Sequence, residues 1–297
     1  MRDPLTDIVL LMNPKASTSK LVEGAGPWRV IRKSEGEAFY CVVLEGGCEI
    51  SVNNEEIQRL SSGDFILVPS TYTLVNTSID QAPMKTVSHP QTIAAGHVRI
   101  GNTDGPVELR MLVGHCQFDT KDKDLILSLL PKHIAIKGQH RISTIVGLLL
   151  DESRANRPGR EVVQQGFLQL LMIEALRSTE HLNSSSGIVK GLADARLNRA
   201  ITLIHSHPDQ YWNISHLAKR ACMSRSAFFT RFNTVVGITP MKYLQFWRMA
   251  LAKKMLLETR ATTDIIAEKI GYKSASAFST AFSKFVGVSP SQYRSQT

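Results

Sequence analysis

Two short segments near the C-terminus combine isolated basic side chains with small hydroxyl-bearing side chains at helical spacing. Cationic and hydroxyl groups on one helix face can bind phosphate oxygens and the edges of bases in the major groove of a duplex. The two segments therefore predict two DNA-contacting helices. The candidate residues are Arg225, Ser226, Phe229, Thr230 and Arg231 in the first segment, and Lys273, Ser276, Ser279, Thr280 and Lys284 in the second.

Both segments belong to a helical pattern that occurs twice between Asn213 and Arg294. Each copy predicts a short helix, a tight turn and a second helix that a serine caps and a glycine ends. A repeated helix-turn-helix predicts one chain that contacts two successive turns of a duplex. At a constant offset of 50 residues, Phe228, Phe232, Gly237 and Pro240 in the first copy match Phe278, Phe282, Gly287 and Pro290 in the second.

The segment between the copies determines their spacing. Residues 241–259 carry Leu244, Trp247, Leu251 and Met255 at helical spacing, which predicts one long helix. Such a rigid connection would place the two recognition helices about 34 Å apart, one turn of DNA.

The two copies differ in their turns and in their outer faces. Cys222 stands where the second copy has Gly271. A left-handed turn at this position would cost cysteine about 1 kcal/mol relative to glycine. The second outer face is almost entirely Ser, Thr and Ala, so we expect phosphate contacts and shape readout there and most base reading in the first copy.

Excess positive charge is confined to the same part of the chain. The net charge is +9, and residues 193–297 hold 15 Lys and Arg against 5 Asp and Glu, whereas the remaining residues hold 20 against 21. Neutralisation of phosphates requires such a basic segment because each contact releases condensed counterions. The partner indicated is a polyanion.

The C-terminal segment resembles the DNA-binding domain of AraC/XylS-type transcriptional regulators. The motifs that carry the resemblance are Leu217-Ala218, Met223–Phe228, Gly237–Pro240, Trp247–Met249, Ile270–Tyr272 and Phe285–Pro290, and the final Tyr293-Arg294 fits the end of the domain. The resemblance implies a domain over residues 190–297 in which the outer face of each second helix contacts promoter DNA. It also implies RNA polymerase as a partner and activation as the outcome.

The first part of the chain shows a different pattern. Short alternating runs at Phe39–Leu44, Cys48–Val52, Phe65–Val68 and Leu109–Val113 predict strands, and Asn53-Asn54 predicts a hairpin turn. Regularly spaced short strands predict an antiparallel sandwich or barrel. The fold class expected for the whole chain is therefore α+β, with a β-barrel domain and an all-α domain.

The run from Gly63 to Pro69 has the form Gly-Asp-x4-Pro. With Pro27-Trp28, Phe39-Tyr40 and Leu129–Pro131 it resembles the cupin-like N-terminal domain of some AraC-type regulators, which implies such a domain over residues 1–135. Cupin enzymes hold a metal with His and carboxylate ligands, but here Tyr40 and Leu74 stand where two such histidines would lie. We therefore expect no metal, no cofactor and no enzymatic activity.

A cupin-like barrel could bind a small effector in its mouth. The candidate effector-binding residues are Trp28, Phe39, Cys41 and Val43, and simple core packing is the alternative for all four. Cys41 and Cys48 fall on consecutive predicted strands and are candidate redox sensors. A small molecule and an oxidant both remain open as the signal.

Residues 136–187 are expected to form a helical region and a linker. Ile142–Leu150 and Glu161–Leu182 predict two amphipathic helices, which could pack on the barrel or form a homodimer interface. The run His181–Gly187 predicts a flexible linker.

The whole sequence excludes a membrane-spanning segment and shows no secretory signal, so a cytoplasmic, nucleoid-associated protein is expected. The leading hypothesis is a sequence-specific DNA-binding regulator under the control of its N-terminal domain. Two alternatives remain: a metal-dependent cupin enzyme with an ancillary DNA-binding domain, and an architectural protein that binds DNA without sequence preference.

Overall fold

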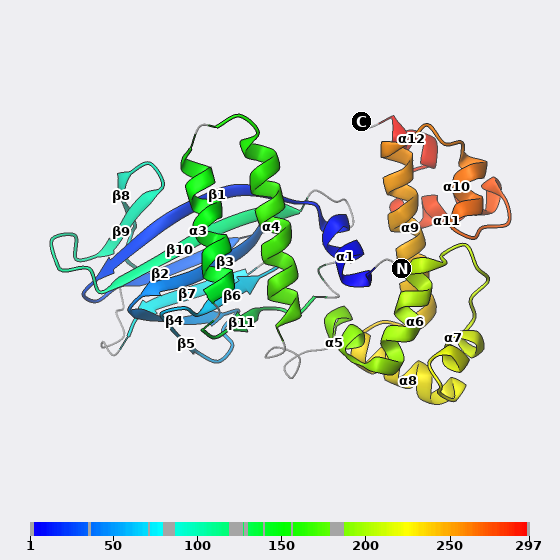
Figure 1. The fold of residues 1–297 in the computed structure, drawn as a ribbon, viewed down its shortest axis with the longest axis horizontal. Helices are drawn as coiled ribbons and strands as arrows, with labels where there is room; N and C mark the ends of the chain where they lie inside the picture. Colours follow the sequence, from blue (N-terminus) through cyan, green and yellow to red (C-terminus); the bar gives the residue numbers. More distant parts are fainter. Residues whose placement is uncertain are drawn as a thin grey trace. The chain divides into compact units, whose positions relative to one another are not determined.

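The chain forms two compact units in a computed structural model, which describes residues 3–34, 37–70, 72–79, 87–118, 127, 130–138, 140–155, 157–178 and 187–295. The N-terminal unit comprises Met12–Ser185, and the C-terminal unit comprises Met1–Leu11 with Ser186–Thr297. The chain therefore crosses from one unit to the other twice (Figure 1).

The N-terminal unit is built from two β-sheets. The strands of the seven-stranded sheet are, in spatial order, β11 (Ile134–Ile136), β6 (Phe65–Val68), β3 (Glu37–Glu45), β10 (Leu109–Phe118), β1 (Pro14–Ala25), β9 (His97–Gly101) and β8 (Gln91–Ala94). Those of the four-stranded sheet are β2 (Arg29–Ser34), β7 (Tyr72–Ser78), β4 (Gly47–Val52) and β5 (Gln58–Ser61). The four predicted strands are confirmed as parts of β3, β4, β6 and β10. The expectation of an antiparallel sandwich or barrel does not hold for one strand pair, because β1 pairs with β9 in parallel.

The core of this unit is formed by strands in which buried and partly exposed side chains alternate. In β4, every second side chain is buried, and Cys48, Ile50 and Val52 join Phe39 and Cys41 of β3 in one apolar cluster. Side chains with a period of two that point to one face of each sheet pack in this way between two sheets.

The predicted turn at Asn53-Asn54 and the Gly-Asp motif at Gly63 have the backbone conformations that their residue types favour. Asn53 and Asn54 have φ of 53° and 59°, so both lie in the left-handed region that asparagine tolerates. Gly63 has a φ of 86°, and the Asp64 carboxylate next to it accepts hydrogen bonds from the backbone N–H groups of Ser61 (2.9 Å) and Gly138 (3.0 Å). The Gly-Asp pair therefore fixes the entry to β6 and ties it to the loop after β11.

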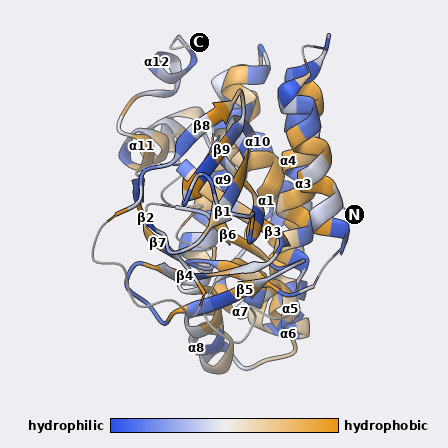
Figure 2. Cartoon of the chain, turned by 90° about the vertical axis from the view of Figure 1, so that its left-hand side faces the viewer, coloured by the Kyte–Doolittle hydropathy of each residue, from blue (hydrophilic) through white to orange (hydrophobic). Residues whose placement is uncertain are grey.

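Helices α3 (His140–Arg154) and α4 (Arg160–Arg177) lie against the face of the seven-stranded sheet (Figure 1). Figure 2 shows hydrophobic and hydrophilic stretches alternating along both helices, as the predicted amphipathic pattern requires. Ile142, Leu149, Leu168 and Leu171 are among their buried residues. The second helix ends at Arg177, five residues before the predicted end, and the predicted linker falls almost entirely outside the described residues.

The C-terminal unit is all-helical. Its helices are α1 (Pro4–Met12), α5 (Ile188–Ala193), α6 (Ala195–Ser206), α7 (Ile214–Arg220), α8 (Arg225–Val236), α9 (Pro240–Glu258), α10 (Thr263–Lys269), α11 (Ala275–Val286) and α12 (Pro290–Arg294). The long connecting helix predicted over 241–259 is α9, and the predicted helix pairs are α7–α8 and α10–α11. The sequence pattern did not identify α1, and Met1–Leu11 group with the C-terminal unit, whereas the N-terminal domain was expected to begin at residue 1.

Candidate DNA-binding surface

The two recognition helices, α8 and α11, begin and end in the same way. The hydroxyl of Ser224 accepts from the backbone N–H of Ala227 (3.3 Å), and that of Ser274 accepts from Ala277 (3.1 Å). Each helix ends at a glycine in the left-handed region, with φ of 90° at Gly237 and 87° at Gly287. Each cap stabilises its helix by about 1 kcal/mol.

Aromatic side chains fix the inner face of each recognition helix. Phe228 and Phe232 of α8 are fully buried, and so are Phe278 and Phe282 of α11. The rings of Phe232 and Tyr243 lie 5.8 Å apart at a steep angle, which connects α8 to the long helix α9. With the inner face fixed, the orientation of each outer face follows.

Most of the predicted contact residues are exposed on the outer faces of the two recognition helices. Nine of the ten are exposed and Ser279 is half-buried: Arg225, Ser226, Phe229, Thr230 and Arg231 on α8, Lys273 just before α11, and Ser276, Ser279, Thr280 and Lys284 on α11. Phe229 is the one large apolar side chain of the set and is 39% exposed. This surface is the candidate DNA-binding surface.

Arg231 and Thr280 have partners within the C-terminal unit, in addition to a contact of 3.4 Å between the hydroxyls of Ser226 and Ser224. The Arg231 guanidinium donates from Nε to Asp194 (2.5 Å), the residue that caps α6. The hydroxyl of Thr280 donates to the carbonyl of Ser276 one turn earlier (3.0 Å). Part of the donor capacity of both residues is therefore used to hold helices in place.

The turns within the two motifs have the same hydrogen bonds despite their different residues. Cys222 has a φ of 55° and Gly271 a φ of 79°, so cysteine occupies the left-handed conformation expected from the alignment. The N–H of Met223 donates to Ala218 in the first turn, as that of Tyr272 donates to Ala267 in the second. The second turn is one residue longer, because its helices start 49 and 50 residues after their counterparts.

One side chain of the Trp247–Met249 motif, to which the sequence assigned no role, links the second motif to the loop before the first. Arg248 on α9 donates from Nε to the carbonyl of Pro208 (2.8 Å) and from Nη2 to that of Gln210 (2.9 Å). The same guanidinium lies 5.7 Å from the ring centre of Tyr272 in the second turn. Arg248 thus holds the loop before the first motif and the turn of the second on one helix. No spacing rule would have found it, because its hydrogen-bond partners are backbone carbonyls.

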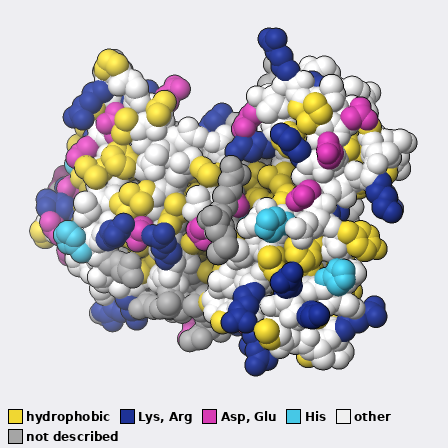
Figure 3. Space-filling view, turned by 45° about the vertical axis from the view of Figure 1, so that its right-hand side comes forward, with side chains coloured by type: hydrophobic (Ala, Val, Ile, Leu, Met, Phe, Trp, Pro, Cys, Tyr) yellow, Lys and Arg dark blue, Asp and Glu magenta, His cyan; other side chains and the backbone are white. Residues whose placement is uncertain are grey.

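Positive charge is denser around the first motif. Figure 3 shows several Lys and Arg side chains in the lower part of the C-terminal unit, where α5 to α8 lie in Figure 1, and a mixture of acidic and basic side chains in the upper part. Lys219 and Arg220, at the end of α7, are exposed beside the first turn and were not among the predicted contacts. Their position makes them additional candidates for phosphate contacts.

Helix α1 is held to the C-terminal unit by a buried chain of hydrogen bonds. Asp7 Oδ2 lies 3.1 Å from His205 Nδ1, and His205 Nε2 lies 2.7 Å from the hydroxyl of Tyr243. The His205 ring also stacks on Trp247 with ring centres 3.7 Å apart. Burial lowers the pKa of His205 in spite of the Asp7 carboxylate, so the imidazole is neutral near pH 7. A neutral ring can donate from Nδ1 to Asp7 and accept at Nε2 from Tyr243.

This network predicts a loss of stability of the C-terminal unit in mild acid. The unfolded chain protonates His205 near its ordinary pKa of 6.5, whereas the folded unit resists protonation. The unfolded state therefore binds more protons below about pH 6.5, and stability falls there by at most about 1.4 kcal/mol per pH unit. The check is the urea midpoint at pH 7.5 and pH 5.5. We expect the decrease in urea midpoint between pH 7.5 and pH 5.5 to be smaller in His205→Gln than in the wild-type protein. It should be unchanged in His216→Gln, which removes an exposed histidine of α7.

The predicted effector residues of the barrel lie in a nearly filled core. The interior cavity has a volume of about 20 Å³, and Trp28 and Phe39 line it together with Arg32 and Asn76. Cys41 and Val43 are fully buried in the surrounding cluster and are not part of the cavity lining. A space of this size holds about one water molecule, so an effector there would have to displace side chains.

The two candidate redox cysteines are free and buried, and they lie on strands of different sheets, β3 and β4. Burial raises the pKa of the Cys48 thiol to about 12 and raises that of Cys41 well above its ordinary value. Cys116 is buried in the same way, whereas Cys222 is exposed. Since the thiolate is the reactive form, these three buried thiols are poorly reactive.

A labelling experiment tests this difference between the thiols. We expect a maleimide to modify Cys222 rapidly in the native protein and to modify the other three only after denaturation. Mass spectrometry of the labelled protein gives the count and the sites. Cys222→Ser should abolish native labelling, and rapid labelling of Cys41 or Cys48 would contradict the burial argument.

The structure brings no metal-binding set together within its described residues. Tyr40 is buried with its hydroxyl 2.9 Å from the hydroxyl of Ser19, and Leu74 lies in the barrel core. His97 and His115 lie near the Glu23 and Glu37 carboxylates, at 3.3 and 3.8 Å. Among the described helices, none is long and apolar enough to cross a membrane.

The comparisons with known proteins agree with this architecture. A sequence profile described as Cupin matches residues 3–180, and one described as a helix-turn-helix domain matches residues 217–296. The chain is 30% identical over 283 residues to a putative AraC-like transcription regulator of Streptomyces lividans, with 92% of this chain and 91% of the relative covered. The chain belongs to the AraC family of transcription regulators.

Other members of the AraC family match over similar lengths. The HTH-type transcriptional regulator AlkR of Acinetobacter baylyi is 29% identical over 289 residues, which cover 93% of this chain and 94% of the relative. The C-terminal domain of AraT, a response regulator from Geobacillus stearothermophilus, is 32% identical and covers 35% of this chain and 87% of that structure, with a TM-score of 0.34. This AraC-family protein is a DNA-binding transcription regulator, and both full-length relatives carry the names of transcription regulators.

Proposed function

We propose that this protein is a sequence-specific activator of transcription that contacts two successive turns of promoter DNA. The observation that carries the proposal is the pair of capped recognition helices, α8 and α11, within one compact unit. The helix between them, α9, has 19 residues and a length of about 28 Å. Arg248 on α9 binds the loop before the first motif and the turn of the second, which supports a fixed separation of the two outer faces. A double contact with DNA requires such a separation.

The two motifs would contribute differently to recognition. Arg225, Ser226 and Thr230 are exposed at the start and middle of α8, next to the basic end of α7. We assign base reading to this helix, because guanidinium and hydroxyl groups can pair with base edges in the major groove. Lys273, Ser276 and Lys284 of the second motif would bind phosphates and fix the register.

We assign control to a small molecule at the N-terminal unit rather than to an oxidant. The thiols of Cys41 and Cys48 are buried and have raised pKa values, which slows their reaction with oxidants. A ligand that binds one arrangement of the protein more tightly than another shifts the population between them. Trp28 and Phe39 line the small barrel cavity, where such a ligand would have to displace side chains.

A homodimer and RNA polymerase are the proposed protein partners, in a cytoplasmic protein associated with the nucleoid. Apolar side chains remain exposed on α3 and α4, among them Leu148, Val163, Leu170 and Val162, the last 74% exposed. Exposed apolar side chains of this kind are often covered in an interface. Sedimentation of the purified protein would test the dimer, and a monomer at micromolar concentration would contradict it.

Selection of bound duplexes from random DNA tests the proposed specificity. We expect an enriched site with two blocks of preferred bases one helical turn apart, with the stronger preference in one block. The affinity should fall steeply with salt concentration because phosphate contacts release counterions. A flat preference across all duplexes would instead support the architectural alternative.

A further inference from the structure

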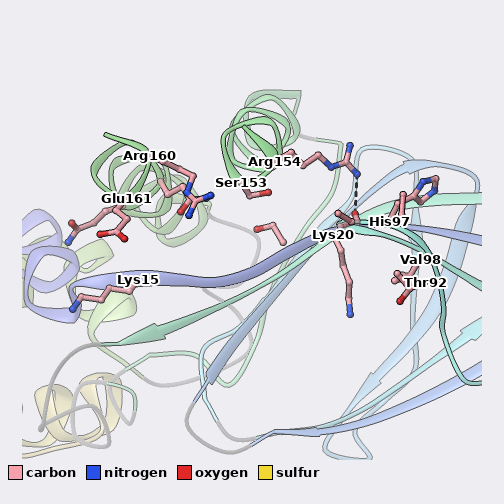
Figure 4. A pocket seen from close by; sticks show the side chains of 15 residues that line it. Lys15, Lys20, Thr92, His97, Val98, Ser153, Arg154, Arg160 and Glu161 are labelled. Carbon is pink, nitrogen blue, oxygen red and sulfur yellow. Dashed lines mark hydrogen bonds between the residues drawn. The ribbon is translucent and has the colours of Figure 1, made fainter. Parts of the chain in front are cut away.

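The N-terminal unit has a second, larger cavity outside the barrel core. It is an open groove of about 1190 Å³ between β1 and β9 on one side and the end of α3 and the start of α4 on the other (Figure 4). Lys15 and Lys20 line it from β1, and Arg154, Arg160 and Gln164 line it from the two helices. Unlike the barrel cavity, this groove can hold a metabolite without displacement of side chains.

The lining of the groove is strongly basic. Lys15, Lys20, Arg154 and Arg160 contribute four positive charges, and Glu161 is the one acidic residue among the lining residues. Burial, with a smaller contribution from the nearby Arg32, lowers the pKa of Lys20. Clustered cations of this kind attract an anionic ligand.

The arginines at the groove differ from the other arginines of α3, α4 and the connection between them. Arg141, Arg157 and Arg177 each lie within ion-pair distance of a glutamate, at 3.2, 3.7 and 3.3 Å. Within the described part of the chain, Arg160 forms no such pair, and Arg154 donates to the carbonyl of Gly96 (3.0 Å) rather than to a carboxylate. The charge of both guanidinium groups is therefore available to a ligand.

The positions of the cations constrain the ligand. Figure 4 shows Arg160 extending from α4, Arg154 from α3, and Lys15 and Lys20 from β1, distributed around the groove rather than directed at one point. Several separated cations favour a ligand with more than one anionic group over one with a single carboxylate or phosphate.

We propose that this groove binds a small organic polyanion, a polycarboxylate or a phosphorylated metabolite, and that this ligand is the effector. The proposal rests on the proposed control of DNA binding by a small molecule. Both segments that line the groove lead to the C-terminal unit: β1 follows α1 directly, and α4 precedes the second crossing of the chain. Gln165 of α4, at the groove, donates to the side chain of Asn13 at the junction of α1 and β1. A ligand that draws β1 and α4 together would act on both crossings.

Titration calorimetry of the full-length protein tests the site, with citrate and inorganic pyrophosphate as probes at constant ionic strength. We expect at least one probe to bind, and the stronger one distinguishes a carboxylate from a phosphate ligand. Arg160→Gln should weaken binding about tenfold or more, because a charge-assisted contact is lost. The matched control is Arg157→Gln, which changes an exposed arginine three residues away that does not line the groove. Binding of neither probe, or equal weakening by both variants, would overturn the site.

A separate measurement tests the regulatory role. The affinity of the wild-type protein for its selected DNA site is measured with and without the bound probe. We expect a change of at least threefold that Arg160→Gln abolishes. Calorimetric binding with an unchanged DNA affinity would overturn the effector role and leave the anion site standing. Failure to select any DNA site would overturn the proposed function itself and would not bear on the calorimetric result.

Discussion

Replacement of Gly271 by alanine should destabilise the C-terminal unit by more than about 3 kcal/mol and reduce DNA affinity by at least tenfold. Two costs add at this position. The φ of 79° is strained for any residue with a Cβ, and that Cβ would lie 2.5 Å from Arg248 Nη2 and 2.6 Å from the carbonyl oxygen of Asp209. The clash displaces the side chain of Arg248, which holds the two motifs together. DNA affinity and stability should therefore both fall. Urea unfolding and a titration with the selected duplex measure the two effects.

Two other variants separate the sources of the loss. Gly287 has a φ of 87°, and no neighbouring atom lies within 4 Å of the place that an alanine methyl group would take, so Gly287→Ala carries the strain without the clash and should cost about 1–2 kcal/mol. Cys222→Gly removes strain from the first turn and should leave stability unchanged or raise it by up to about 1 kcal/mol. Equal losses in Gly271→Ala and Gly287→Ala would show that the contact with Arg248 is not important.

The helical half of the molecule could be predicted well because its signals are local. Caps, terminating glycines and the 3.6-residue spacing of the phenylalanines act within a few residues, and these features placed α7 to α11 within a few positions. Even the left-handed turn at Cys222 could be inferred, since the repeat itself supplied Gly271 as a reference. Exposure of the outer faces then follows from burial of the inner faces.

Features that depend on contacts between distant residues escaped prediction. Helix α1 joins the C-terminal unit through Asp7 and His205, which are 198 positions apart, and no periodicity connects them. The role of Arg248 depends on carbonyl groups, which every residue has. Cys41 and Cys48 are close in sequence, yet their strands belong to different sheets, because pairing between strands is decided by the whole barrel. The basic groove likewise assembles from several separate elements and has no motif.

The two recognition helices should respond unequally to loss of one basic side chain. Arg225→Ala should weaken binding to the selected site by about 1–3 kcal/mol and relax base preference in one block, because the guanidinium to which we assign a base contact is lost. Lys273→Ala should weaken binding to selected and random duplexes alike and reduce the salt slope by about one, as expected for a phosphate contact. Both side chains are exposed, so neither change should lower stability appreciably. Binding titrations at several salt concentrations distinguish the two outcomes.

The effects of Arg225→Ala and Lys273→Ala together show how the two motifs divide DNA recognition. If both variants lose affinity without any change in base preference, α8 and α11 both act through the backbone of DNA, and specificity must come from DNA shape. If Lys273→Ala relaxes preference as Arg225→Ala does, the second motif reads bases in spite of its Ser, Thr and Ala face. The proposed division of roles requires the unequal result, since the charged and polar groups that can read bases are concentrated on the first motif.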